Sequence, residues 1–318
     1  MPGFRTLAEA ANFTQDQLLS GLATALITSD ETLVFADIAI TDRPSIKGNR
    51  EVSRPDVQNV DCDDEIVDSA ADTEPFTFPL ITKVTQFTSC RQVQGRASTF
   101  TDQLAIDIEQ GARAMGESLA QDAAIGSGAA GQLYGYEALT PASQIITPAG
   151  ADLELEDLEH LSDIVKLKTM GQTAYVANAA TRRRISRLMK DAGIMGTMEL
   201  SGTTFVAPVL NGLPILRNDN LPDGIVWLVN FDADQGVGMW LGDNGTSAAG
   251  LADFSSQAAG PTGNVGGIES VGGIFTLIPI GWMPNRDRFR HRLVVDVAQS
   301  LISPLAIGAL DVDGVIAS

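Results

Sequence analysis

Cysteine and histidine are scarce in this sequence. Among 318 residues there are two cysteines, Cys62 and Cys90, and two histidines, His160 and His291. Two cysteines without a paired spacing indicate neither a zinc site nor a disulfide scaffold, so we expect two reduced thiols, with an intersubunit disulfide as the open alternative. No serine or cysteine stands beside either histidine in a recognisable nucleophile motif. The sequence therefore predicts no catalytic centre and no cofactor.

Basic residues are also few. The chain has 21 lysines and arginines against 40 acidic residues, a formal net charge of −19. Sequence-independent binding of nucleic acid needs basic side chains that displace counterions, so this balance argues against direct DNA binding. An acidic surface would instead repel packed DNA, and adaptation to a salty environment is an alternative explanation of the same charge.

No apolar run is long enough to cross a membrane. The longest, residues 271–283, contains glycine and proline and predicts a buried strand. The first residues lack the basic start and the apolar run of a secretion signal. We therefore expect a soluble protein that is made in the cytoplasm and has no membrane partner. The length and a hydrophobic content of 44% allow two subdomains.

Residues 101–125 predict a long amphipathic helix. Thr101 is the expected N-cap, and Gly126 and Gly128 are expected to end the helix. Apolar residues recur at spacings of three and four, which places them on one stripe: Leu104, Ile108, Ala112, Met115 and Leu119. Such a rod is roughly 36 Å long, at about 1.5 Å per residue. Its length, after a long extended segment, favours a part shaped for assembly.

The segment before this helix predicts an arm and a projecting hairpin. Residues 1–35 have too little apolar surface for a core of their own. Residues 36–95 are strand-like and polar, with an acidic connector in the middle. Residues 76–84 alternate, which predicts one face made of Phe76, Phe78, Leu80, Thr82 and Val84. An isolated two-stranded ribbon is marginal in water, so this hairpin should rest on something else, such as a neighbouring subunit.

The second half predicts an α/β unit. Helices are expected over residues 154–170 and over the segment that Asn178 caps and Gly193 ends, with a buried strand at residues 173–177 between them. Short strands are expected at residues 203–210, 213–218 and 224–231, with a turn at Asn211-Gly212. Residues 242–273 predict a long loop or insertion, after which strands resume and the chain closes on residues 305–315.

These pieces, in this order, resemble the major capsid protein of tailed bacteriophages, the Hong Kong 97 type fold. The stretch GRASTFTDQLAIDIEQGARAMGESLAQDAAIGSG is similar to the spine helix of that family, and DLELEDLEHLSDIVKLK with TAYVANAATRRRISRLMKDAG is similar to its helix–strand–helix unit. NGLPILRNDNLPDG and the late LAIGAL are similar to two of its strands.

The resemblance implies an α+β capsid fold and a division of the chain. The implied parts are an N-terminal arm (1–35), an extended β-hairpin loop (36–95), a peripheral domain with the spine helix (96–140), an axial domain (141–240), a return segment of the peripheral domain with a loop insertion (241–292) and a C-terminal strand region of the axial domain (293–318).

The resemblance also implies a function. It is self-assembly through pentamers and hexamers into an icosahedral virion shell, put together in the host cytoplasm, that encloses double-stranded DNA without binding it specifically. Portal, scaffolding and decoration proteins are the implied partners, and the absence of a long helical preface suggests that scaffolding comes from a separate protein. Some members of the family form lysine–asparagine crosslinks, for which Lys47 is the candidate donor, although a solvated turn is the simpler interpretation.

Two clusters of cations are candidate assembly interfaces. The first lies on the predicted third helix: Arg182, Arg183, Arg184, Arg187 and Lys190. These side chains either form an exposed face balanced by local acids or pair with the acidic surface of residues 152–163 of a neighbouring subunit. The second cluster is expected to pair across an interface or with a partner on the shell: Arg286, Arg288, Arg290 and Arg292.

Other motifs favour plain structural roles. Gly126 to Gly131 matches G-x-G-x-x-G, but a helix precedes it where a dinucleotide site needs a strand, so a domain junction is predicted. The acidic residues 61–65, and Asp311 with Asp313, lack the full spacing of a calcium loop and predict solvated turns. A nanocompartment shell of encapsulin type and a soluble α/β enzyme remain the alternative functions.

Overall fold

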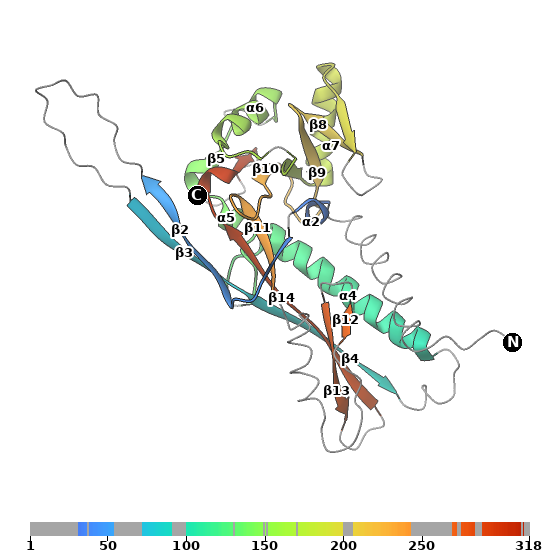
Figure 1. Ribbon diagram of the computed structural model, residues 1–318. Coiled ribbons are helices and arrows are strands. Elements are labelled where there is room, and N and C mark those ends of the chain that lie inside the picture. Colours follow the sequence, from blue (N-terminus) through green and yellow to red (C-terminus); the bar gives the residue numbers. More distant parts are fainter. Residues whose placement is uncertain are drawn as a thin grey trace, which may run out of the picture.

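The computed structural model builds two β-sheets, a long helix and a projecting two-stranded ribbon (Figure 1). The structure describes residues 31–36, 38–53, 72–90, 100–129, 131–148, 150, 152–169, 171–199, 206–242, 269–271, 275–283, 288–312 and 314. In this part of the chain no helix is both long and apolar enough to cross a membrane.

The larger sheet has seven strands and a helical layer on one face. Its order is β5-β15-β10-β6-β9-β8-β7. The strands are β5 (Ile145–Ile146), β6 (Thr173–Ala177), β7 (Gly196–Glu199), β8 (Val206–Leu210), β9 (Leu213–Arg217), β10 (Ile225–Asn230) and β15 (Ile307–Asp311). Helices α6 (Leu155–Ile164) and α7 (Ala179–Asp191) bury Leu158, Leu161, Ile185 and Met189 against this sheet.

The sequence predicted most of this sheet closely. Strand β6 has the predicted bounds, and Asn178 caps α7 because its side-chain oxygen accepts a hydrogen bond from Thr181 N at 2.8 Å. The β8–β9 turn has φ of 52° at Asn211 and 82° at Gly212, as a tight hairpin with two left-handed positions requires. Strand β7 was not predicted.

Helix α6 is shorter than predicted. It ends at Ile164 instead of residue 170, because the chain turns extended at Val165. The Val165 side chain is fully buried and packs close to Gly308 of β15, a contact that a continuing helix would not make. At the other end the predicted acidic start is a capping box formed by Glu154 and Asp157.

The second sheet carries the spine helix α4 (Phe100–Ile125), which confirms the predicted long helix, although Thr101, the predicted N-cap, lies within the helix. Its strands are β1 (Ile38–Thr41), β4 (Ile81–Cys90), β11 (Val237–Gly242), β12 (Glu269–Val271), β13 (Phe275–Trp282) and β14 (Arg288–Leu301). Strand β14 pairs with β4 along one side and with β13 and β11 along the other. Ala112, Met115 and Leu119 of α4 are buried against Leu293, Val295 and Val297 of β14, as the stripe predicted for these three residues.

The spine helix also reaches the larger sheet. Ala124, near its end, packs with Tyr136 and Leu139 of the short helix α5 (Tyr136–Leu139) against the face of the larger sheet opposite α6 and α7. The Gly-rich segment between α4 and α5 is the predicted junction. Gly126 has no room for a Cβ, which would lie 2.2 Å from the Leu133 carbonyl oxygen.

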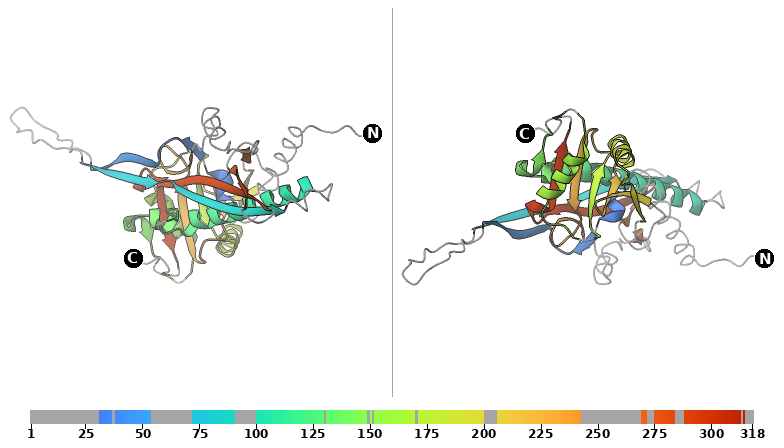
Figure 2. Two further views of the ribbon diagram at one scale, coloured as in Figure 1. Left: turned by 90° about the horizontal axis from the view of Figure 1, so that it is seen from below. Right: turned by 90° about the horizontal axis from the view of Figure 1, so that it is seen from above.

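The predicted hairpin is the ribbon of β2 (Ser45–Ser53) and β3 (Asp72–Pro79), which extends beyond both sheets (Figure 2). The sequence predicted one alternating strand over β3 and β4, and that prediction was wrong beyond Leu80, where Thr82 and Val84 are exposed. Before Leu80 the half-buried side chains are those of Phe76 and Phe78. After Leu80 they are those of residues 81, 83, 85 and 87, so the half-buried face changes from even-numbered to odd-numbered positions. The shift arises because β3 pairs with β2 whereas β4 pairs with β14.

Candidate functional site

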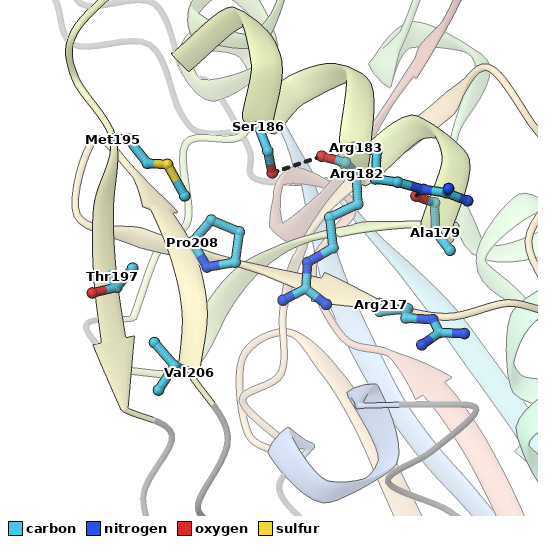
Figure 3. Close-up of a pocket in the computed structure, with 9 residues that line it drawn as sticks. All are labelled: Ala179, Arg182, Arg183, Ser186, Met195, Thr197, Val206, Pro208 and Arg217. Atoms are coloured by element: carbon cyan, nitrogen blue, oxygen red, sulfur yellow. Dashed lines mark hydrogen bonds between the residues drawn. The ribbon is translucent and has the colours of Figure 1, made fainter. Parts of the chain in front are cut away.

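A groove with arginines on its walls lies between α7 and the β7–β8 hairpin (Figure 3). It has a volume of about 470 Å³. Its lining comes from α7, β7, β8 and β9: Ala179, Arg182, Arg183, Ser186, Met195, Thr197, Val206, Pro208 and Arg217. Met195 is 44% exposed and Val206 is 52% exposed, so the groove offers uncovered apolar surface beside cations. The chemistry suits an acidic segment with some apolar surface.

Arg182 forms an ion pair within the chain, and its predicted role at a subunit interface stays a prediction. Its guanidinium lies 2.8 Å from a carboxylate oxygen of Glu31, and the two side chains are only 17% and 7% exposed. Glu31 also accepts a hydrogen bond from Arg217 N at 3.0 Å and donates its own N–H to the Arg217 carbonyl at 2.8 Å. Arg182 therefore fixes the segment of α2 (Thr32–Phe35) to the edge of β9.

The other four predicted cations of α7 are exposed. Arg184 lies 3.8 Å from Asp152, and both side chains are well exposed, so this pair is weak. Arg183 donates from Nε to the Ala179 carbonyl at 3.0 Å. Within the described part of the chain, Arg183, Arg187 and Lys190 form no ion pair. Arg182 and Arg184 are balanced locally, and the remaining three cations leave positive charge on the surface. Their pairing with a neighbouring subunit stays a prediction.

Arg217 adds a further cation to the groove. Its Nε donates to Asp219 Oδ1 at 2.8 Å, and a second contact joins the same two side chains. This hydrogen bonding raises the pKa of the Arg217 guanidinium above its ordinary value. No sequence motif singled out Arg217, although it lies within the strand predicted over residues 213–218.

The second predicted cluster lies on β14. Arg288 and Arg292 are exposed and Arg290 is half-buried, all on alternate positions, whereas Arg286 lies outside the described residues. His291, between them in sequence, points to the other face and stacks on Phe87, with ring centroids 5.5 Å apart. The strand therefore separates the histidine from the arginines.

The remaining predicted residues are dispersed. Lys47 is exposed on β2 opposite Thr77, and its role as a crosslink donor stays a prediction. His160 is exposed on α6, as predicted. Asp311 is buried, so the prediction of a solvated turn at this residue was wrong. Cys62, the acidic residues 61–65 and Asp313 lie outside the described residues, and the described ones contain no group of three histidine, cysteine or acidic side chains placed to hold a metal.

A buried ion pair that the sequence did not reveal joins the ribbon base to the spine helix. Lys83 Nζ of β4 lies 2.7 Å from Asp122 Oδ2 and donates to Ser118 Oγ at 2.7 Å. The charged side chains are 13% and 15% exposed. A single lysine within the apolar alternation of β4 was the available signal.

Together, the long helix on one sheet, the larger sheet with its two helices and the projecting ribbon define the Hong Kong 97 type capsid fold. No family model and no curated protein match the sequence. Among solved structures, the chain is similar to the holo-SrpI encapsulin complex from Synechococcus elongatus, with a TM-score of 0.65 and 14% identity over 88% of this chain and 86% of that one. It is similar to the cyanophage A-1(L) capsid (TM-score 0.62, 12% identity, 92% of each chain). It is also similar to a chain of Mycobacterium phage Cain (TM-score 0.56, 14% identity, 97% and 98% covered). The predicted fold class is confirmed.

Proposed function

We propose that this chain is a shell-forming structural protein, the major capsid protein of a tailed bacteriophage. Copies would assemble as pentamers and hexamers into an icosahedral virion shell that encloses double-stranded DNA. Support comes from the fold, which the chain shares over most of its length with the cyanophage A-1(L) capsid and the SrpI encapsulin. The net charge of −19 fits a shell that contains DNA without holding it.

The observation that carries this proposal is the projecting ribbon. Its base is anchored, because Ile46 is buried and Phe78 packs edge-on against Tyr134 with ring centroids 5.3 Å apart. Its outer part, from Asp72 to Pro75 on β3, is exposed. Two strands alone are marginally stable in water, so this extension is best explained by a surface on a neighbouring copy that supports it.

The direct test is the particle itself. The full chain is expressed, and its mass is measured by light scattering after size-exclusion chromatography, followed by negative-stain electron microscopy. Closed shells or rings of five and six subunits are expected, with or without added scaffolding protein. A compact monomer at every concentration, with no particles, would contradict the shell function and revive the enzyme alternative.

An encapsulin-type compartment is the second candidate, and the likeness to the SrpI encapsulin complex favours it specifically. The two functions differ in what the particle encloses. Particles isolated from cells that carry the gene are treated with nuclease and opened, and protected double-stranded DNA is expected. A stoichiometric protein cargo without DNA would instead identify a compartment shell. The phage function also includes assembly in the host cytoplasm and three kinds of partner: portal, scaffolding and decoration proteins.

A further inference from the structure

We infer that the acidic face of helix α6 of one copy binds the arginine groove of the next copy, head to tail, around the ring of a capsomer. This inference rests on the proposed shell function and names the partner of the groove. The arginine groove is the groove described above, between α7 and the β7–β8 hairpin. The acidic face of α6 consists of Glu156, Glu159 and Asp163.

The two surfaces lie toward opposite ends of one sheet. Helix α6 packs on β15, the second strand from one edge, and α7 packs on β9 in the other half of the order β5-β15-β10-β6-β9-β8-β7. The groove lies beyond α7, toward the β7 edge (Figure 3). Figure 1 shows both helices at the same end of the molecule, over the larger sheet, and the strand order places β8 and β7 beyond β9, away from β15. A contact between opposite ends of identical units is heterologous, and it closes into a ring when the rotation between copies allows.

The charges of the two surfaces are complementary. Glu156, Glu159 and Asp163 follow at spacings of three and four, are exposed, and form no ion pair among the described residues. Across the interface, Arg183 lines the groove, and Arg187 lies one helical turn further along α7, outside the residues that line it; both arginines are exposed. A guanidinium fork binds carboxylates through paired hydrogen bonds, so two arginines matched to two or three carboxylates fix the register as well as the affinity.

Two cations of the groove are engaged within the chain. Arg182 pairs with Glu31 and Arg217 pairs with Asp219, which leaves Arg183, with Arg187 beside it on α7, to pair with a partner. The groove also has an apolar wall, formed by Met195, Val206 and Pro208, that the neighbouring copy would cover. The ring of His160, exposed on α6 of that copy, is suited to pack on this wall.

Charge exchange tests this contact. The groove variant is Arg183→Glu/Arg187→Glu, and the acidic variant is Glu159→Lys/Asp163→Lys. Each should reduce the yield of capsomers and shells by about tenfold or more, because like charges then face each other. The four-fold variant that carries both exchanges should return assembly to near the wild-type yield. Arg43→Glu and Glu137→Lys, exposed residues outside both surfaces, are matched controls that should assemble normally.

The readouts separate folding from assembly and the interface from the function. Melting followed by circular dichroism must show that each variant folds, and sedimentation velocity measures rings and shells. Normal assembly of both exchanged variants, or a folded four-fold variant that stays unassembled, overturns the inference while wild-type shells still support the proposed function. Wild-type chains that never assemble refute the function itself. If lysines at Asp61, Asp63 and Asp64, instead of those on α6, rescue the groove variant, the occupant is the acidic connector of the ribbon and the inference is wrong.

Discussion

At the scale of single residues, Tyr175 shows how a polar group is accommodated in the core of the larger sheet. The phenol is fully buried on β6 beneath α6 and donates a hydrogen bond to the Leu158 carbonyl at 3.2 Å. Burial raises the pKa of Tyr175 from 10.0 to about 12, and the nearby Glu159 and Asp163 act in the same direction. The neutral phenol is therefore part of the bridge between helix and sheet.

This shift predicts a loss of stability at alkaline pH. The folded-state pKa lies above the unfolded value, so the unfolded chain releases the proton first and the contribution of Tyr175 disappears between about pH 10 and pH 12. The slope is about 1.4 kcal/mol per pH unit for this one group. Urea unfolding at several pH values should give a steeper decline for the wild type than for Tyr175→Phe. The difference between the two proteins at pH 8 reports the lost hydrogen bond, and parallel curves from pH 10 to 12 would contradict the assignment.

Glu31 pairs with residues that are far from it in the sequence, Arg182 and Arg217. Replacing it with alanine leaves the Arg182 guanidinium partly buried without its carboxylate and removes the acceptor of Arg217 N. We expect Glu31→Ala to lower the free energy of unfolding by about 2–4 kcal/mol, since the partner of a desolvated charge is lost. The exposed Glu137→Ala serves as the control, with a change of about 0.5 kcal/mol or less. A similar small change for both would show that the α2 segment is not fixed through Glu31.

At the scale of elements, the spine helix and β4 act as one unit. Residues 81, 83, 85 and 87 of β4 face the helix, and Lys83 lies among them paired with Asp122 and Ser118. The ribbon continues directly from β4 through Leu80. The ion pair therefore fixes the register between the helix and the base of the ribbon.

Removing one partner of this pair should be costly. Lys83→Ala leaves Asp122 shielded from water without its cation, so a decrease of about 3 kcal/mol in unfolding free energy is expected. Replacing both residues, Lys83→Met/Asp122→Leu, should recover most of that loss, because no unpaired charge remains. Lys47→Ala, on the exposed ribbon, is the matched control and should leave stability unchanged. Equal losses in the single and double variants would mean that packing, and not the charge pair, joins the two elements.

Local signals predicted the elements, and long-range contacts explain where prediction failed. The apolar stripe of the spine helix and the Asn178 cap depend only on residues close together in the sequence, so α4, β6 and α7 were predicted. The early end of α6 depends on Val165 packing on β15, and the change of face at Leu80 depends on which strand pairs with which. The arginine cluster was likewise predicted as a group, but the partner of Arg182 lies 151 residues away and could not be read locally.

At the scale of the whole molecule, the fold divides its stability between parts that support themselves and a part that does not. Two sheets bury their apolar faces within the chain, through the clusters around α4 and around α6 and α7. The ribbon beyond its anchored base contributes little to either cluster. Folding of the subunit and its assembly should therefore be separable by mutation.

Truncating the ribbon tests this separation. Replacing residues 50–74 with an Asn-Gly turn keeps Ile46 and Phe78 at the anchored base and removes the exposed outer part. The melting temperature should stay within about 3 °C of the wild type, because few buried contacts are lost, whereas closed shells should no longer form. The control is the double substitution Ile46→Ala/Phe78→Ala in the full-length ribbon, which removes the anchor and should lower the melting temperature as well as assembly. Shells of normal size from the truncated chain would show that the ribbon is not an assembly element, and a truncated chain that fails to fold would show that the ribbon stabilises the subunit itself.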